Sequence, residues 1–223
     1  MFETDIVKIS ELAHKSGGYL YCDGANFNAV VGKLKPGDLG IDAMHINLHK
    51  TFSTPHGGGG PGSGPVVFSD RLEKFCPTPL VKNIKGDFIL VEASNEKDLT
   101  KSFGRLNVFH GQMGMFVRAM SYMLSHGADG LKQVSEDAVL NANYLRASLS
   151  SHLTPAFDGF CMHEILFSDD FLKDTGVETL DFAKAMIDEG YHPMTIYFPL
   201  VIHGALLVEP TETESKQSLD HFI

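Results

Sequence analysis

Asp23 and Lys50 are the two residues whose types and spacing suggest covalent chemistry. Lys50 comes directly after an apolar run at 43–48, where an ammonium group would be costly to bury unless the amine were neutral and covalently engaged. Apolar surroundings favour the neutral amine of a lysine, which is the nucleophile that forms a Schiff base. From its position alone, however, Lys50 could equally be a surface lysine that follows a strand.

Asp23 gives the lysine a partner. It stands at the end of an earlier apolar run, 19–22, in an Asp-Gly pair that by itself is typical of a turn. If the two runs are neighbouring parallel strands, both side chains meet at the same edge of the sheet. Pyridoxal phosphate needs such a pair, a lysine for its aldehyde carbon and a carboxylate that keeps its pyridine nitrogen protonated. The pair therefore predicts a site for this cofactor, with Lys50 as the Schiff-base lysine.

A glycine-rich loop follows Lys50, with six glycines among the ten residues from His56 to Pro65. Glycine lets backbone N–H groups converge on an anion, so the segment Gly57-Gly60 is a candidate phosphate cradle. The alternative is a flexible linker, but two prolines and the flanking histidine favour a shaped turn. The loop matches neither a Walker loop nor a dinucleotide fingerprint.

Three histidines near Lys50 raise the question of a metal. His45, His49 and His56 do not have the spacing of a known metal motif, and carboxylates at helical spacing are missing nearby. We therefore expect no metal site. His49, next to Lys50, is better interpreted as a contact of the cofactor or substrate.

The elements that must position these residues form an α/β layer. A helical pattern over 3–16 precedes short apolar runs at 19–22, 43–48 and 65–68, each typical of a buried parallel strand. Ligands of such layers bind at the carboxyl ends of the strands. We place a domain boundary near residue 112, with the large domain in 1–112 and a small α+β domain in 113–223. The small domain is expected to contain helices at 113–126, 129–150 and 178–189 and strands at 162–167 and 205–208.

The amino-acid composition and net charge narrow the class of protein. The 223 residues include 28 acidic and 18 basic side chains, a formal charge of −10, which argues against nucleic acid as a partner. Three cysteines are too few for a disulfide framework. No apolar run is long enough to cross a membrane and no signal peptide is visible. We expect no membrane association and a cytoplasmic location, or the mitochondrial matrix in a eukaryote.

Several segments resemble one family. The stretches 23–29, 47–52 and 56–65 look like the P-protein of the glycine cleavage system, glycine dehydrogenase (decarboxylating). Further matches run along the chain at 102–105, 127–131, 138–145, 162–164 and 209–214. The resemblance implies fold type I, the aspartate-aminotransferase-like fold of pyridoxal-phosphate enzymes, here as a partial large domain and a small C-terminal domain.

The same resemblance implies roles for individual residues. Lys50 would be the Schiff-base lysine and Asp23 the partner of the pyridinium nitrogen. Ala25 would pack against one face of the cofactor ring, and His49 and Thr51 would line the cofactor, with His49 counted beside Lys50 as catalytic. A further group, His163, Glu164 and Glu209, belongs either to a domain interface near the site or only to the architecture of the small domain.

The implied reaction is the decarboxylation of glycine with pyridoxal 5'-phosphate and transfer of the aminomethyl group to the lipoyl arm of the H-protein. The implied partners are glycine, the lipoylated H-protein, and a missing N-terminal half or companion subunit, in a homo- or hetero-oligomer. One alternative is another fold-type-I enzyme, such as a serine hydroxymethyltransferase or an amino-acid decarboxylase. The tetraglycine loop argues against this alternative. Another is a non-catalytic subunit that completes a site with a second chain.

The resemblance to this family extends to both ends of the chain. We therefore expect the chain to be a piece, about the C-terminal half, of a longer protein. A parallel sheet without its other strands exposes unpaired edges and apolar faces. We therefore predict that the isolated chain binds pyridoxal phosphate weakly and has little or no decarboxylase activity. An absorbance titration with the cofactor tests this, and tight stoichiometric binding would contradict it.

Overall fold

The computed structural model describes residues 3–58, 60–92 and 101–223. These residues form two compact units. The N-terminal unit consists of residues 4–27 and 34–127, and the C-terminal unit consists of residue 3, residues 28–33 and residues 128–223. The two compact units describe this chain alone. They therefore do not test the predicted boundary between a large and a small domain near residue 112, which stays a prediction.

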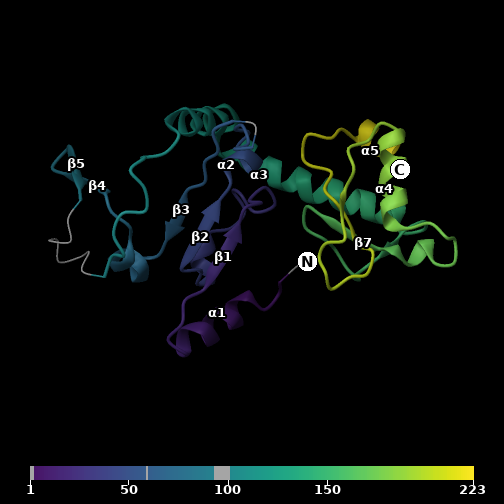
Figure 1. Ribbon diagram of the computed structural model, residues 1–223, viewed down its shortest axis with the longest axis horizontal. Helices are drawn as coiled ribbons and strands as arrows, with labels where there is room; N and C mark the ends of the chain where they lie inside the picture. Colours follow the sequence, from purple (N-terminus) through teal and green to yellow (C-terminus); the bar gives the residue numbers. More distant parts are fainter. Residues whose placement is uncertain (1–2, 59, 93–100) are drawn as a thin grey trace. The chain divides into compact units, whose positions relative to one another are not determined.

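A three-stranded sheet is the centre of the N-terminal unit. Its strands are β1 (Tyr21–Gly24), β2 (Ala43–Ile46) and β3 (Val66–Phe68), in the order β1-β2-β3 (Figure 1). β1 and β2 are parallel, which confirms the expected pair. β3 is antiparallel to β2 and exposed, so the expectation of a third buried parallel strand is wrong. A parallel strand requires a crossover, usually a helix packed on the sheet, whereas here the short helix α2 (Leu48–Thr51) and the glycine-rich loop at residues 56–65 return the chain antiparallel beside β2.

Short helices and a hairpin complete this unit. The expected first helix is present as α1 (Ile6–Lys15), and Gly17 follows it at a φ of 80°. The strand expected over 43–48 ends at Ile46, and Lys50 lies in the short helix α2 that follows it. The remaining elements are η1 (Pro36–Leu39), η2 (Asp70–Phe75), and the hairpin of β4 (Leu80–Ile84) and β5 (Asp87–Val91).

The buried carboxylate of Asp42, with only 3% of its side chain exposed, connects α1, the entry to β1 and the segment after β3. One carboxylate oxygen lies 2.7 Å from His14 Nε2 and accepts from the Leu20 N–H at 2.9 Å. The other accepts from the Ser69 hydroxyl, and the Arg71 guanidinium donates to both oxygens at 2.9 and 3.1 Å. Burial acts to raise the pKa of Asp42, but these hydrogen bonds and the Arg71 charge lower it to about 2.

The long helix α3 (Met113–Leu149) enters the C-terminal unit at residue 128. The expected interruption between two helices is confirmed at Gly127, where φ is 65° and ψ is −176°. Before this point the helix does not bury the face that its pattern predicts. Met113 and Val117 are exposed, whereas Met115 and Ala119 are buried.

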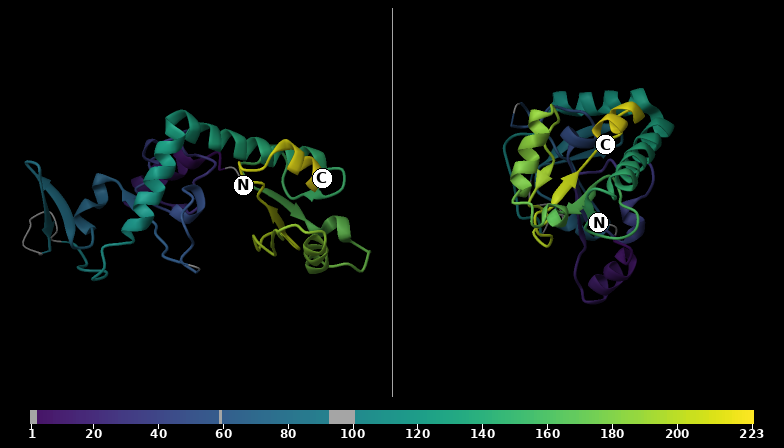
Figure 2. Two further views of the ribbon diagram at one scale, coloured as in Figure 1. Left: turned by 90° about the horizontal axis from the view of Figure 1, so that it is seen from above. Right: turned by 90° about the vertical axis from the view of Figure 1, so that its right-hand side faces the viewer.

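The C-terminal unit contains a four-stranded antiparallel sheet in the order β6-β7-β9-β8. In the two views of Figure 2, α4 lies on one side of this sheet and the 128–149 part of α3 on the other. The expected helix at 178–189 and strand at 205–208 are confirmed, and the strand expected at 162–167 begins later. The elements are β6 (Thr154–Pro155), β7 (Ile165–Ser168), η4 (Asp169–Leu172), α4 (Thr179–Asp188), β8 (Thr195–Ile196), β9 (Leu206–Val208) and α5 (Lys216–Phe222).

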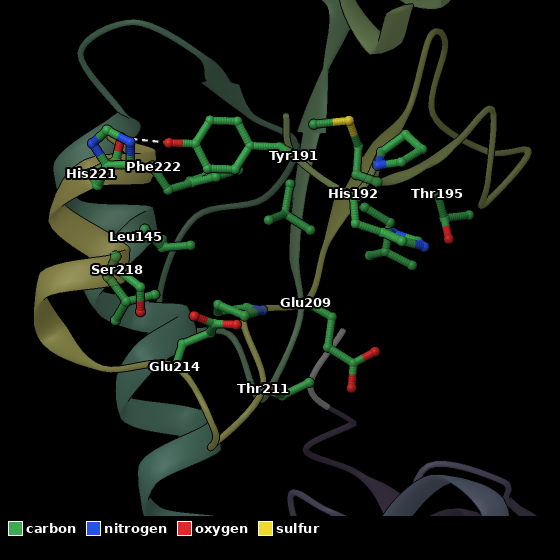
Figure 3. Close-up of a pocket in the computed structure, with 16 residues that line it drawn as sticks. Leu145, Tyr191, His192, Thr195, Glu209, Thr211, Glu214, Ser218, His221 and Phe222 are labelled. Atoms are coloured by element: carbon green, nitrogen blue, oxygen red, sulfur yellow. Dashed lines mark hydrogen bonds between the residues drawn. The ribbon is translucent and has the colours of Figure 1, made fainter. Parts of the chain in front are cut away.

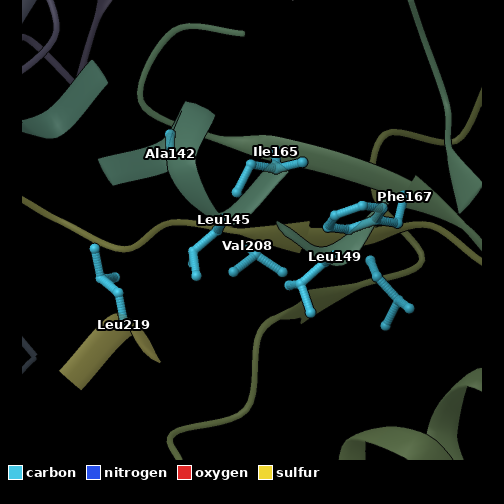
Figure 4. Packing of buried hydrophobic residues seen from close by; sticks show 8 residues of the cluster. Ala142, Leu145, Leu149, Ile165, Phe167, Val208 and Leu219 are labelled. Atoms are coloured by element: carbon cyan, nitrogen blue, oxygen red, sulfur yellow. The ribbon is translucent and has the colours of Figure 1, made fainter. Parts of the chain in front are cut away.

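The core of this unit forms where one stripe of α3 meets the sheet and α5 (Figure 4). Ala142, Leu145 and Leu149 recur at helical spacing and face the sheet. The cluster is completed by Ile165, Phe167, Leu206, Val208 and Leu219. Within the described residues no helix is long and apolar enough to span a membrane.

We predict that Asp42→Asn lowers the free energy of unfolding by about 1–2 kcal/mol at pH 7, a value discounted because Arg71 is partly exposed to solvent. The pKa of Asp42 in the folded chain lies below its unfolded value of about 3.9. Its contribution is therefore complete above about pH 5 and is lost as the pH falls through the folded value. Urea unfolding at several pH values measures this.

The matched control is Asp38→Asn, which removes an exposed carboxylate from the same unit. The difference in unfolding free energy between wild type and Asp42→Asn should shrink between pH 5 and pH 2. A difference that does not change over this range would contradict the proposed stabilisation by the ionised carboxylate.

Candidate functional site

The parallel pairing of β1 with β2 brings the segments that carry Asp23 and Lys50 to one edge of the sheet. Asp23 pairs with His45 and Gly24 with Ile46, and α2 begins two residues after β2 ends. Gly24 is required here, because a Cβ atom at this position would overlap the His45 carbonyl oxygen. The close approach of the two backbones thus explains the Asp-Gly pair.

Asp23 is the last but one residue of β1, and 73% of its side chain is exposed. Its Oδ1 accepts a hydrogen bond from the Ala25 N–H at 3.0 Å and lies 3.2 Å from His45 Nε2. The turn that these contacts stabilise brings Ala25 next to the carboxylate. Within the described part of the chain, Asp23 Oδ2 has no hydrogen-bond partner.

His49, the neighbour of Lys50 in the chain, lies against His56. The two imidazole rings meet edge to face, with centroids 4.5 Å apart. Burial lowers the pKa of His49, and the nearby charges of His56 and Lys50 lower it further, so this imidazole is neutral near pH 7. His49 Nδ1 is buried and has no hydrogen-bond partner among the described residues. Lys50 itself is exposed.

Thr51 connects α2 to the loop that follows Asp23. It is only 5% exposed, and its Oγ1 accepts a hydrogen bond from the Phe27 N–H at 3.0 Å. This contact fixes the loop that contains Ala25 to the helix that contains Lys50. The sequence-based role of Thr51, a direct contact of the cofactor, stays a prediction.

Hydrogen bonds within the glycine-rich loop and to β2 and α2 shape it. Its first part is held by the Gly58 N–H, which donates to His56 Nδ1 at 2.9 Å. Its last part is held by Ser63 and Pro65, whose carbonyl oxygens accept from the Leu48 and Ile46 N–H groups. This arrangement is a shaped turn at the end of β2. Gly59 lies outside the described residues, and the phosphate-binding role of Gly57-Gly60 stays a prediction.

The third group of candidate residues lies wholly in the C-terminal unit. His163 Nε2 is 3.7 Å from Glu164 Oε1 and 3.9 Å from Glu209 Oε1, and Asn28 Nδ2 donates to Glu209 at 3.1 Å. The three potential ligand atoms of His163, Glu164 and Glu209 lie within 4.8 Å of one another, so they could hold a metal ion. The expectation of no metal therefore stays a prediction.

A cavity of about 510 Å³ lies in the same unit (Figure 3). Glu209 and Glu214 lie on the side opposite Tyr191 and His221, where the Tyr191 hydroxyl donates to the His221 carbonyl oxygen at 2.8 Å. None of the residues predicted to hold the cofactor lines it. We therefore place the candidate site at the end of β1 and β2 and not in this cavity.

Sequence reasoning missed three residues that the structure brings into these groups: Tyr21, His45 and Asn28. His45 was considered only as a metal ligand, yet it is the direct cross-strand partner of Asp23. Aligning the two expected strands from their carboxyl ends would have found it. Asn28 had no signal, because its partner Glu209 lies 181 residues further along the chain.

Solved structures with the same backbone arrangement define the class of protein. A glycine decarboxylase (P-protein) of the glycine cleavage system matches 97% of this chain and 49% of its own, at a TM-score of 0.76 and 22% identity. An aspartate aminotransferase from Thermus thermophilus matches 98% of this chain and 57% of its own, at a TM-score of 0.65 and 15% identity. The chain thus has fold type I, the fold expected from the sequence.

Sequence comparisons define the family. Residues 134–223 match the family model described as "Glycine dehydrogenase, C-terminal domain". Two relatives are described as "Probable glycine dehydrogenase (decarboxylating) subunit 2". The one from Caulobacter vibrioides is 66% identical over the whole chain and 43% of its own length, and the one from Kosmotoga olearia is 54% identical over the whole chain and 45% of its own. The chain belongs to the glycine dehydrogenase (decarboxylating) family and spans less than half the length of these relatives.

We predict that Thr51→Val lowers the free energy of unfolding by about 1–3 kcal/mol, because it removes the acceptor of the Phe27 N–H without changing the volume much. Thr51→Ser, which keeps the hydroxyl, should lose less. Urea unfolding of both variants and the wild type measures the difference. A Thr51→Val variant as stable as the wild type, with the loss confined to Thr51→Ser, would show that packing of the methyl group, and not the hydrogen bond, is what matters.

Proposed function

We propose that this chain is the part of a glycine dehydrogenase (decarboxylating) that binds pyridoxal 5'-phosphate through Lys50. The whole protein would decarboxylate glycine and transfer the aminomethyl group to the lipoyl arm of the H-protein. The observation that carries the proposal is the placement of Asp23 and Lys50 at one edge of the parallel pair β1–β2. The 66% identity with the Caulobacter vibrioides relative supports it.

The residues present fit the cofactor. Lys50 is exposed, so its amine can reach an aldehyde. Asp23 Oδ1 is held by the Ala25 N–H, and within the described residues Oδ2 is left to accept from a pyridinium N–H. His49 has a buried Nδ1 with no partner among the described residues, and burying such an atom is costly unless a ligand or water satisfies it.

When bound, pyridoxal phosphate supplies an electron sink for the carbanion left by the loss of carbon dioxide. The chain's own residues would then have distinct tasks. Lys50 would hold the cofactor by its amine, and Asp23 would place its carboxylate against the ring nitrogen. Ala25 presents only a methyl group, so a flat ring can lie close to the backbone. The neutral His49 ring can accept or donate one hydrogen bond without adding charge.

The partners that follow from this proposal are glycine, the lipoylated H-protein and a companion subunit. The relatives are called subunit 2, which supports a second kind of subunit in the assembly. The matched P-protein structure is described as a part of the glycine cleavage system. A glutamate decarboxylase from Lactobacillus brevis shares the fold at only 13% identity, so it gives no support to the alternative of another amino-acid decarboxylase. We also propose a cytoplasmic location.

The test is covalent trapping of the cofactor. We expect pyridoxal phosphate and borohydride to label Lys50 alone, as located by peptide mass spectrometry. The label is measured in this chain and in a chimera in which it replaces the matching 224 residues of the Caulobacter vibrioides relative. Lys50→Arg should abolish the label, and Lys35→Arg, at an exposed lysine of the same unit, should not. A chimera without label at Lys50 would overturn the proposal.

A further inference from the structure

Three polar side chains form a row across β1 and β2: Tyr21, His45 and Asp23. The Tyr21 hydroxyl contacts His45 Nδ1, and His45 Nε2 lies 3.2 Å from Asp23 Oδ1. The Tyr21 and His45 rings are also stacked, with centroids 5.9 Å apart and 15° between their planes. The row thus ends on the carboxylate that we assign to the cofactor.

The strand register creates this row. Tyr21 and Asp23 are two residues apart in β1, so their side chains share one face of the sheet. His45 is the direct partner of Asp23 in β2 and therefore points to the same face. Its side chain is 26% exposed and is held between the phenol ring and the carboxylate.

The row also selects one form of the imidazole. An ionised carboxylate can only accept, so His45 must carry a proton on Nε2 to bond with Asp23. Nδ1 is then the acceptor of the Tyr21 hydroxyl proton in the neutral ring. Tyr21 thereby keeps the imidazole in the tautomer and the orientation that Asp23 needs.

We propose that His45, oriented by Tyr21, is a positioning residue that holds the Asp23 carboxylate ready for the ring nitrogen of pyridoxal phosphate. This inference rests on the proposed function. The Ala25 N–H donates to Oδ1, and His45 Nε2 lies 3.2 Å from the same oxygen, so rotation of the carboxylate is opposed from two sides. With 73% of its side chain exposed, Asp23 has little packing to fix it otherwise.

The tautomer is the first measurement, and it needs no cofactor. We expect nitrogen-15 NMR of the 223-residue chain to show the proton of His45 on Nε2 at neutral pH. Tyr21→Phe should lower the population of this tautomer. A His45 ring that is protonated mainly on Nδ1 in the wild type would overturn the inference, whatever the cofactor does.

The second measurement is the affinity of the chimera for pyridoxal phosphate, followed by absorbance. His45→Leu should weaken binding about tenfold, because it removes the polar contact that restrains the Asp23 carboxylate. His45→Gln, which keeps an N–H near the position of Nε2, should recover most of this loss. The matched control is His203→Leu, which removes the imidazole of another His–Asp pair, with Asp169 at 2.9 Å, in the C-terminal unit.

The outcomes separate the two proposals. If Lys50 is labelled in the wild-type chimera but His45→Leu binds the cofactor as tightly as the wild type does, His45 has no positioning role and the proposed function stands. If His45→Leu and His45→Gln lose equal affinity and equal unfolding free energy, the residue only stabilises the strands and the inference is wrong. If Lys50 is not labelled in the wild type, the proposed function itself fails.

Discussion

The parallel register of β1 with β2 is the constraint on which the candidate site depends. A shift by one residue would turn every side chain of β1 to the other face of the sheet. Asp23 would then lose both His45 and its place at the edge where α2 begins. Gly24 restricts the register further, because only glycine tolerates the close approach of β2 at that point.

Asp42 holds the other end of the same strands. Its carboxylate gathers hydrogen bonds from α1, from the entry to β1 and from the segment after β3, and its own N–H donates to the Leu20 carbonyl oxygen at 2.8 Å. The two acids of this sheet are thus used in opposite ways. Asp42 is buried and both its oxygens accept hydrogen bonds, which suits a structural role. Asp23 is exposed, and one of its oxygens has no partner among the described residues, which suits contact with a ligand.

Much of the site was predictable, because the chemistry demands unusual residues in a set order. An aspartate and a lysine at the ends of successive apolar runs already indicate pyridoxal phosphate, and the matches at 23–29 and 47–65 specify the family. The first helix, the parallel pair and the break at Gly127 were likewise visible, because glycines and hydrophobic periodicity are local signals. The antiparallel direction of β3 was not, since direction depends on how a loop returns and not on the composition of the strand.

The sequence by itself determined the family and the fold class, and it predicted the lysine and aspartate of the candidate site. Only the tertiary structure decided which side chains surround them. His45 faces Asp23 because two strands pair in one register, and Asn28 meets Glu209 because residues 28–33 pack with a unit formed much later in the chain. Such contacts join residues that are distant in sequence, and no local pattern of residue types encodes the distance or the direction of a side chain in space.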